Sequence, residues 1–248
     1  TSEQAKTVNL NSQYIATSSL TLEMQQELLS AENMRILAKA AQYLDIPIET
    51  LTSNIAARSQ GTKHDFYSEG DYWWPDPVNP AGPYQRRDGE SNPDNFLAHR
   101  LSLMNFSDIT ATLTSAYILT NEQKYVDAAL RHLMAWFVTP ETKMNPSLLY
   151  GQAIQGRHTG RSIGIIDTIH LVEVARSIEV LADLEKIPLA KLTSLKEWFG
   201  TYLNWLNTHP YGLTEKNHPN NLGITWSMQA SAFARIVDDQ ETLKWVRN

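Results

Sequence analysis

The hydrophobic positions of the chain recur mostly at the spacing of α-helices. Over residues 22–44, apolar side chains return every three or four positions, which is typical of one buried helical face. The same spacing predicts further helices over residues 106–119, 122–138, 162–186, 189–207 and 223–237. Glu241 begins a segment that we expect to form another helix.

Residues 106–119 and 122–138 are expected to pack as an antiparallel pair. Thr120 is a candidate N-cap for the second helix, because Gln123 follows it by three residues, as in a capping box. Pro140 then ends this helix, since proline cannot continue the helical hydrogen-bond pattern.

Long helices joined by short turns, without a convincing strand pattern, predict an all-α protein. A bundle, a solenoid and a helical toroid all fit this arrangement. The chain has no clean repeat of fixed length, which argues against the solenoid. We expect a single helical domain over residues 1–248. Because the chain ends at Asn248, just after a helix start, we also expect this domain to be truncated at its C-terminus.

One long segment has neither helical nor strand periodicity. It covers residues 64–77 and 82–89, and it combines Trp and Tyr with charged residues and prolines. Disordered segments are poor in aromatic residues, so this composition predicts a long ordered loop that has a function. Stacked Trp and Tyr beside the paired arginines Arg86 and Arg87 suit an anionic, ring-shaped ligand such as an acidic sugar.

Composition and charge narrow the class of ligand. The 248 residues carry a formal net charge of −6, so the chain lacks the basic field expected of a nucleic-acid-binding protein. An anionic polysaccharide would need a local cluster of Arg, Lys and His. No apolar run approaches the roughly 18 residues of a membrane span, and the N-terminus lacks the regions of a signal peptide. Cysteine is absent, which excludes disulfides and thiol catalysis.

A glycine-rich segment offers a second place for chemistry. Arg157, His158 and Arg161 precede an expected helix, whose N-terminus can hold a carboxylate. A glycine-rich helix start with surface arginines explains the same residues. Asp167 lies within an apolar run, and it is either the buried partner of an arginine or an active-site group.

A third candidate is the segment 215–226, at the entry to the last predicted long helix. It combines His218 with the amides of Asn217, Asn220 and Asn221. Ordinary loop and cap roles explain one asparagine easily. They explain three asparagines beside a histidine less well.

The other histidines give no indication of a metal site. His99, His132, His170 and His209 stand singly on helices or at their ends, where we expect them at the core edge or on the surface. No pair of them has metal-ligand spacing. The chain also lacks a nucleophile elbow, a phosphate-binding glycine loop and a dinucleotide fingerprint, so no cofactor is expected.

Three of these segments together resemble the alginate-lyase-type polysaccharide lyases. They are the aromatic loop at 64–89, the run 160–167, and the Asn/His segment before residues 226–229. The resemblance covers roughly residues 60 to 240, and the aromatic loop is its most specific part. Members of this family fold as (α/α) toroids. The resemblance therefore implies an (α/α) toroid or incomplete barrel of antiparallel helix pairs.

The resemblance implies a polysaccharide lyase that cleaves a uronate polymer, such as alginate or a glucuronan, by β-elimination. In this class the substrate carboxylate is neutralised by Asn, His or Arg, while His or Tyr transfers protons. The resemblance assigns catalysis to Asn217, His218 and Asn221. The substrate-binding residues that we expect from the three segments are His64, Tyr67, Tyr72, Trp73, Trp74, Arg86, Arg87, His158, Arg161 and Asn220.

The expected partner is then an acidic polysaccharide or oligosaccharide, with no nucleic acid and no membrane. A periplasmic or secreted location follows, with the signal peptide already removed. The sequence does not choose between mannuronate, guluronate and glucuronate polymers. It leaves the oligomeric state open as well.

The chain departs from the family's pattern in two places. The family has Asn-Asn-His before its aromatic residue and glutamine, whereas Asn220 and Asn221 are followed here by Leu222. Either His218 fills the role of that histidine, or this protein lacks the group. The catalytic Arg and Tyr of the family are expected on a later helix, beyond Asn248.

Two other classes of function stay open. An (α/α)-barrel glycoside hydrolase would use two carboxylates, drawn from Asp71, Asp88 and Asp167. A non-catalytic helical protein would bind acidic glycans through the aromatic and arginine loop alone.

Overall fold

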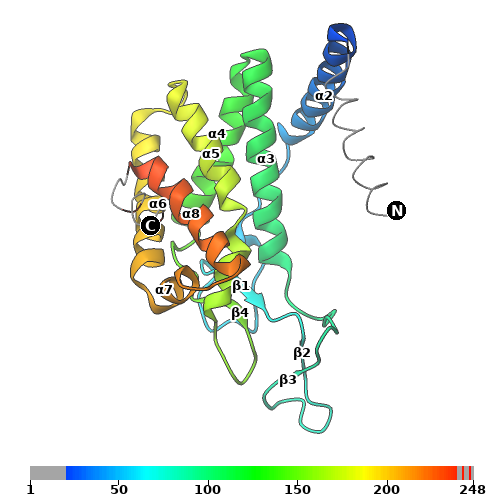
Figure 1. Ribbon diagram of the computed structural model, residues 1–248, viewed down its shortest axis with the longest axis vertical. Coiled ribbons are helices and arrows are strands. Elements are labelled where there is room, and N and C mark those ends of the chain that lie inside the picture. Colours follow the sequence, from blue (N-terminus) through cyan, green and yellow to red (C-terminus); the bar gives the residue numbers. More distant parts are fainter. Residues whose placement is uncertain (1–20, 239–241, 243–245, 247–248) are drawn as a thin grey trace, which may run out of the picture.

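The computed structural model describes residues 21–238, Thr242 and Val246, and this part of the chain is mostly helical (Figure 1). The predicted helical class is therefore confirmed. In chain order the elements are helix α2 (Leu22–Tyr43), the 3-10 helix η1 (Leu51–Ser53), strands β1 (Tyr67–Glu69), β2 (Trp73–Trp74) and β3 (Gln85–Arg86), helices α3 (Ala98–Thr120) and α4 (Gln123–Phe137), strand β4 (Tyr150–Ala153), the 3-10 helix η2 (Ser162–Thr168), and helices α5 (Leu171–Asp183), α6 (Leu189–Thr208), α7 (Pro210–Lys216) and α8 (Asn221–Val237).

The long helices pack in two layers. α3, α5 and α8 lie side by side in one layer, and α4 and α6 form the second layer against them. Figure 1 shows that α3, α5 and α8 begin toward the end of the molecule that carries β1 and β4. Their N-termini, with their partial positive charges, are therefore directed toward that end. None of the helices in the described part of the chain is long and apolar enough to cross a membrane.

Most of the predicted long helices are confirmed. Those over 22–44, 122–138, 189–207 and 223–237 agree with the structure within two residues at each end. The helix predicted over 106–119 is present, but it begins earlier, at Ala98. Apart from Thr242 and Val246, the segment from Glu241 onward lies outside the described residues.

The single helix predicted over 162–186 is wrong. The structure has the 3-10 helix η2 over its first seven residues, and α5 begins only at Leu171. Gly164 lies against the backbone of β4, where an added Cβ would come within 2.7 Å of Gly151. This close approach ties η2 to β4, so the segment does not continue along the axis of α5.

The N-cap expected at Thr120 is also wrong. Thr120 is the last residue of α3, and its hydroxyl donates to the carbonyl of Ala116 at 2.8 Å. Asn121 has a φ of 58°, the left-handed conformation that commonly ends a helix. α4 then begins after Glu122 without a side-chain cap.

The expectation of no strands is wrong for four short segments of the described chain. β1 pairs with β4 in parallel, and β2 pairs with β3 antiparallel. Each strand has only two to four residues, too few to show an alternation of apolar and polar positions. Contacts between segments distant in sequence therefore decide these pairings.

Aromatic side chains fill the space between the two layers. Phe106 on α3 stacks on Trp136 of α4 with ring centroids 4.7 Å apart. Phe199 on α6 lies 5.2 Å from Phe233 of α8. Full burial of a phenylalanine ring stabilises a fold by about 1.5–3 kcal/mol. These contacts fix the helices whose ends carry the loops.

Two histidines are more deeply buried than expected. His99 and His132 are 1% and 3% exposed. The Nδ1 of His99 accepts from the backbone N–H of Tyr67 at 3.0 Å, while Nε2 lies 2.8 Å from the carbonyl of Asn54. This pattern requires a neutral ring with its proton on Nε2. Burial lowers the pKa of both histidines below their ordinary value of 6.5.

We expect the fold to lose stability as the pH falls below about 6.5. A histidine with a lowered folded pKa binds more protons when the chain is unfolded, so the free energy of unfolding increases with pH in this interval. His99→Gln should lower stability at every pH but reduce its pH dependence. Urea unfolding at about pH 5 and about pH 8 measures this. His158→Gln, at an exposed position, is the control, and equal pH dependence of His99→Gln and the wild type would contradict the prediction.

Candidate functional site

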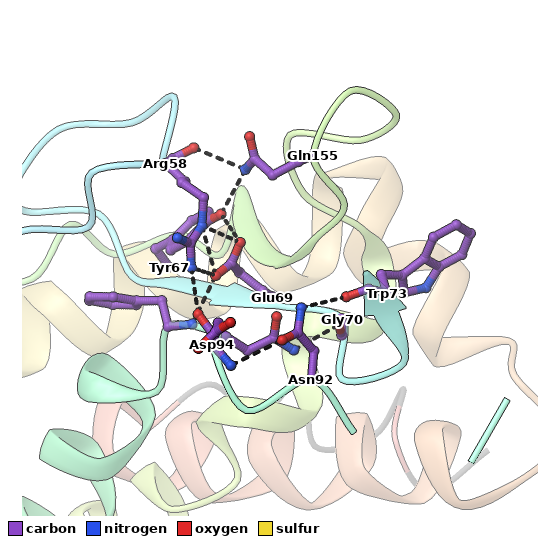
Figure 2. A network of polar contacts seen from close by, with 10 residues as sticks. Arg58, Tyr67, Glu69, Gly70, Trp73, Asn92, Asp94 and Gln155 are labelled. Atoms are coloured by element: carbon purple, nitrogen blue, oxygen red, sulfur yellow. Dashed lines mark hydrogen bonds and ion pairs between the residues drawn. The ribbon is translucent and has the colours of Figure 1, made fainter. Parts of the chain in front are cut away.

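The predicted aromatic loop is ordered by a short hairpin and by side-chain amides. Trp73 of β2 pairs with Arg86 of β3. The Nδ2 of Asn92 donates to the carbonyl of Trp73 at 3.0 Å (Figure 2), and the Nδ2 of Asn95 donates to the carbonyl of Gly70 at 3.0 Å. These bonds replace the regular ladder that a longer strand would supply, and they order the loop without periodic structure.

An ion pair between a buried glutamate and a partly exposed arginine anchors the start of the loop (Figure 2). Glu69 is 4% exposed, and the Nη2 of Arg58 lies 2.5 Å from its Oε1, with Nε 3.0 Å from Oε2. The backbone N–H of Phe96 donates to the same Oε1 at 2.8 Å. Bidentate pairs of this kind are strong and directional, and the bond to Glu69 raises the pKa of Arg58. Glu69 therefore ties β1 to two other segments.

Tyr67, a predicted substrate-binding residue, belongs to this network and also lines a small cavity beside Arg157; its role in binding stays a prediction. Tyr67 is 1% exposed. Its hydroxyl donates to Glu69 at 3.0 Å and accepts from the Nε2 of Gln155 at 2.9 Å (Figure 2). Burial raises its pKa. Tyr67 thus joins β1 to the segment after β4, and the exposed surface of the loop comes from other aromatic residues.

Cationic side chains gather around the first tryptophan of the loop. The guanidinium of Arg157 lies 5.5 Å from the ring centroid of Trp73. Arg161 approaches the same ring, because a Cβ built on Gly70 would lie 2.7 Å from Cδ1 of Trp73 and 3.0 Å from Nη2 of Arg161. Burial, and next the charge of Arg86, lower the pKa of Arg161. The structure therefore brings together predicted residues from both the aromatic loop and the glycine-rich segment.

Arg161 is partly buried and has no carboxylate partner. Its Nε donates to the carbonyl of Gln152 at 2.7 Å. No acidic residue of the described chain forms an ion pair with it, whereas Arg86 is paired with Asp88 at 2.5 Å. The Nη donors of a guanidinium match the two oxygens of a carboxylate. Arg161 is thus suited to receive an anionic group from outside the chain.

The other predicted residues of the loop have different surroundings. Tyr72 is 42% exposed. The guanidinium of Arg87 lies 4.7 Å from the ring centroid of Trp74, a cation–π arrangement. His64 is held by a backbone carbonyl 2.7 Å from its Nδ1. Tyr72, Trp74 and Arg87 therefore extend the surface around Trp73, while His64 supports the base of the loop.

His158 lies in the turn that follows β4. It is exposed, and it lines a small cavity of about 250 Å³ together with Arg58 and Arg157. Gly156 allows the turn to approach the loop closely, since its φ of 76° and a distance of 2.7 Å from a built Cβ to Pro83 leave no space for a side chain. The turn and the aromatic loop therefore form one continuous surface.

The predicted catalytic residues meet in the turn between α7 and α8. The Oδ1 of Asn220 accepts from the backbone N–H two residues later at 3.0 Å, so Asn220 is the N-cap of α8. Asn217 donates its amide to the carbonyl four residues earlier at 3.0 Å. Asn221 is the exposed first residue of α8. The Nδ1 of His218 is buried and lacks a hydrogen-bond partner among the described residues.

His218 and Asn220 line a groove of about 540 Å³ between α5 and α8. Three cations that the sequence pattern did not single out also line it: Arg176, Lys216 and Arg235. Arg176 and Arg235 contact glutamates of α5 at 2.9 and 3.7 Å. Small residues recur every fourth position on the groove face of α8, at Gly223, Ser227 and Ser231. This spacing of small residues, one helical turn apart, can be read from the sequence. It is the sequence signal for the groove face of α8 that the sequence analysis missed.

The structure thus divides the predicted residues into two groups. One surrounds Trp73 and Arg161, and the other occupies the α7–α8 turn. Within the described chain, no hydrogen bond joins a predicted residue of one group to one of the other. The hydroxyl of Tyr211 on α7 donates to the carbonyl of Gly160 at 2.9 Å. This bond connects α7 directly to the segment that carries Arg161.

Each carboxylate that a glycoside hydrolase mechanism would draw on contacts an arginine. Asp167 is 8% exposed, and its Oδ1 lies 3.5 Å from the Nε of Arg100. Of the two roles expected for it, the structure places it as the buried partner of an arginine. Asp71 contacts the same arginine at 3.4 Å. In the part of the chain that the structure describes, no three acidic or histidine side chains are arranged to hold a metal ion.

The chain belongs to the alginate lyase family, whose model matches residues 50–248. The crystal structure of an alginate lyase from Bacteroides ovatus is similar, with a TM-score of 0.77 and 32% sequence identity. The similarity covers 86% of this chain and 57% of the Bacteroides chain, so the chain spans little more than half the length of that relative. A comparison with curated proteins found no match. The resemblance to alginate-lyase-type polysaccharide lyases is therefore confirmed.

For the uronate ligand proposed in the next subsection, we expect Gly70→Ala to weaken binding by on the order of tenfold, the loss of about one charged hydrogen bond. The added methyl group would displace Trp73, Arg161 or both. Isothermal titration calorimetry measures the affinity. Gly200→Ala is the matched control, because its Cβ would meet one side chain at an ordinary 3.6 Å. Equal affinities of Gly70→Ala and the wild type would show that neither side chain contacts the ligand.

Proposed function

We propose that this protein is a lyase that cleaves a uronate polymer, alginate or a glucuronan-like chain, by β-elimination. The observation that supports this most is the partly buried Arg161, which has no carboxylate partner among the described residues and lies beside the ring of Trp73, in a chain of the alginate lyase family. An indole face suits a sugar ring, and a guanidinium suits the carboxylate that distinguishes a uronate from a neutral sugar.

The reaction requires that the substrate carboxylate be neutralised. A base removes the proton on C5, next to the carboxylate, and the electrons form the C4–C5 double bond while the C4–O bond breaks. The leaving oxygen then takes a proton. While the carboxylate is fully charged, the enolate-like intermediate accumulates negative charge on the same group. Hydrogen-bond donors placed in advance at this position supply the largest part of the catalysis.

We assign the role of base to His218. Its Nδ1 has no partner among the described residues, and the residue lines the groove that also contains Arg176 and Lys216. The amides of Asn217 and Asn221 stand beside it in the same turn, where they can donate to the substrate carboxylate. The nearby cations stabilise the negative charge of the substrate carboxylate and the charge that develops as the C5 proton is removed.

Leu222 stands where the family has a histidine. Leucine cannot accept a proton, and Leu222 is partly buried in the first turn of α8. His218 is four residues earlier, in the loop that the cap of α8 holds in place. The Bacteroides relative is longer than this chain, and we assign no residue here to protonation of the leaving oxygen.

The contacts favour elimination over hydrolysis. A glycoside hydrolase needs two carboxyl groups that face the scissile bond. Asp88 is paired with Arg86, and Asp71 and Asp167 both contact Arg100. We also propose an acidic polysaccharide as the partner and a periplasmic or secreted location, because a charged polymer does not cross a membrane unaided.

An absorbance assay tests the proposed function. The protein is incubated with alginate and, separately, with glucuronan, and the ultraviolet absorbance of the unsaturated uronate end is followed. Elimination produces this chromophore. Reducing ends without the chromophore would indicate hydrolysis, and the absence of both would indicate a binding protein.

We expect His218→Ala to lower kcat by a factor on the order of 10²–10⁴, the usual contribution of a positioned general base, with little change in melting temperature. A second protein to be measured is the double variant His218→Ala/Leu222→His. Recovery of activity there would place the base at position 222 in this fold. Near-normal turnover of His218→Ala alone would remove His218 from the mechanism.

A further inference from the structure

Strand β4 contains one residue more than the segment of β1 that it pairs with. Tyr67 is opposite Tyr150, but Glu69 is opposite Ala153. Two steps along β1 therefore match three steps along β4, which defines a β-bulge. Within it, Gln152 has a φ of 52°, in the left-handed region that non-glycine residues rarely adopt. Bulges of this kind re-aim side chains and are frequent beside active sites.

Gln152 is held in this conformation through its backbone N–H, its backbone carbonyl and its side-chain amide nitrogen. Its backbone N–H donates to the Oγ of Ser68 at 2.8 Å. Its side-chain Nε2 donates to the Oδ2 of Asp167 at 3.1 Å. Its carbonyl accepts from the Nε of Arg161 at 2.7 Å. A strained backbone conformation persists only where its surroundings determine it this completely.

Asp167 is the centre of this arrangement. It accepts a hydrogen bond of 2.5 Å from the Oγ of Ser68 as well as the bond from Gln152, and Arg100 lies 3.5 Å away. Ser68, Gln152 and Asp167 are 0%, 8% and 8% exposed. A buried carboxylate with these partners is in a fixed position, and Asp167 is carried by η2.

The other end of the arrangement is the partly buried side chain of Arg161. Its Nε is fixed by the bulge carbonyl, so the plane of the group is determined by the position of Gln152. Its Nη2 points toward Gly70 and the ring of Trp73. Neither Asp167 nor another acidic residue of the described chain forms an ion pair with it. The acid is therefore close enough to orient Arg161 through Gln152, without neutralising its charge directly.

We propose that Asp167 is a positioning residue, which holds the bulge at Gln152 through Ser68 and thereby directs Arg161 toward a uronate carboxylate of the substrate. This inference rests on the proposed function, because it takes a uronate as the ligand. The short β1–β4 pair would then position a substrate-binding side chain as well as stabilise the fold. Through this pair, the position of the buried Asp167 determines the orientation of Arg161, although the two side chains form no ion pair with each other.

A double-mutant cycle tests the proposal. The variants are Asp167→Asn, Arg161→Gln and their combination, and the readouts are KM and kcat on the polymer and the Kd of a uronate oligosaccharide by calorimetry. Arg161→Gln should raise Kd and KM on the order of tenfold, and Asp167→Asn by several-fold, and any fall in kcat should likewise be larger for Arg161→Gln than for Asp167→Asn. If Asp167 acts through Arg161, the double variant should bind like Arg161→Gln alone, within about twofold.

Two further variants separate positioning from general stability. Ser68→Ala keeps the carboxylate but removes its link to the bulge, so a several-fold rise in Kd is expected even if Asp167→Asn fails to fold. Asp108→Asn is the matched control, since Asp108 also accepts a hydrogen bond from a tyrosine and pairs with a lysine. It should lower the melting temperature and leave Kd unchanged.

The outcomes distinguish this proposal from the proposed function. If the wild type binds uronate oligosaccharides but produces no unsaturated ends, the lyase function is wrong, and the cycle on Kd still decides the role of Asp167. Additive effects of Asp167→Asn and Arg161→Gln on Kd would overturn the positioning role. An unchanged Kd in both Asp167→Asn and Ser68→Ala would overturn it as well.

Discussion

Two buried carboxylates hold the loop end of this protein in place. Strand β1 has three residues, too few to be stable through its ladder alone. Glu69 binds Arg58 and the N–H of Phe96, while the neighbouring Ser68 binds Asp167. Adjacent residues of a strand project to opposite faces, so β1 is fixed from both sides. The aromatic loop, the turn after β4 and the start of α3 all take their positions from this strand.

The charge of the protein makes this local order important. A net charge of −6 repels an anionic polymer at long range, yet Arg86, Arg157 and Arg161 are concentrated around one tryptophan. The helix layer adds partial positive charge, because α3, α5 and α8 begin near the same end (Figure 1). These local positive charges therefore attract an anion only within roughly a Debye length, about 8 Å at physiological salt. For the anionic polymer that we propose as the ligand, the affinity would then depend on close contact and on the placement of each guanidinium.

The sequence predicts the parts of this structure that have a repeated signal. Helices such as α4 and α6 contain enough turns for their apolar stripe to be recognised, and the Trp-rich composition correctly indicated an ordered loop. The same composition could not separate Tyr67 from Trp73. Tyr67 is buried because it shares a strand face with Glu69, and that face is determined by Arg58, nine residues before Tyr67. Arg58 itself carries no motif, so only the folded chain reveals the pair.

The bulge at Gln152 illustrates why the site is harder to predict than the fold. A left-handed residue in a strand is usually anticipated from glycine, and β4 does contain a glycine, at position 151. The structure uses Gly151 for close packing against Gly164 and places the strained conformation on Gln152. A glycine at 152 would adopt this φ more easily, but it would lose the amide that binds Asp167. Glutamine is less suited than glycine to this backbone conformation, but its amide can bind Asp167 while its carbonyl binds Arg161. No local propensity in the sequence predicts this requirement.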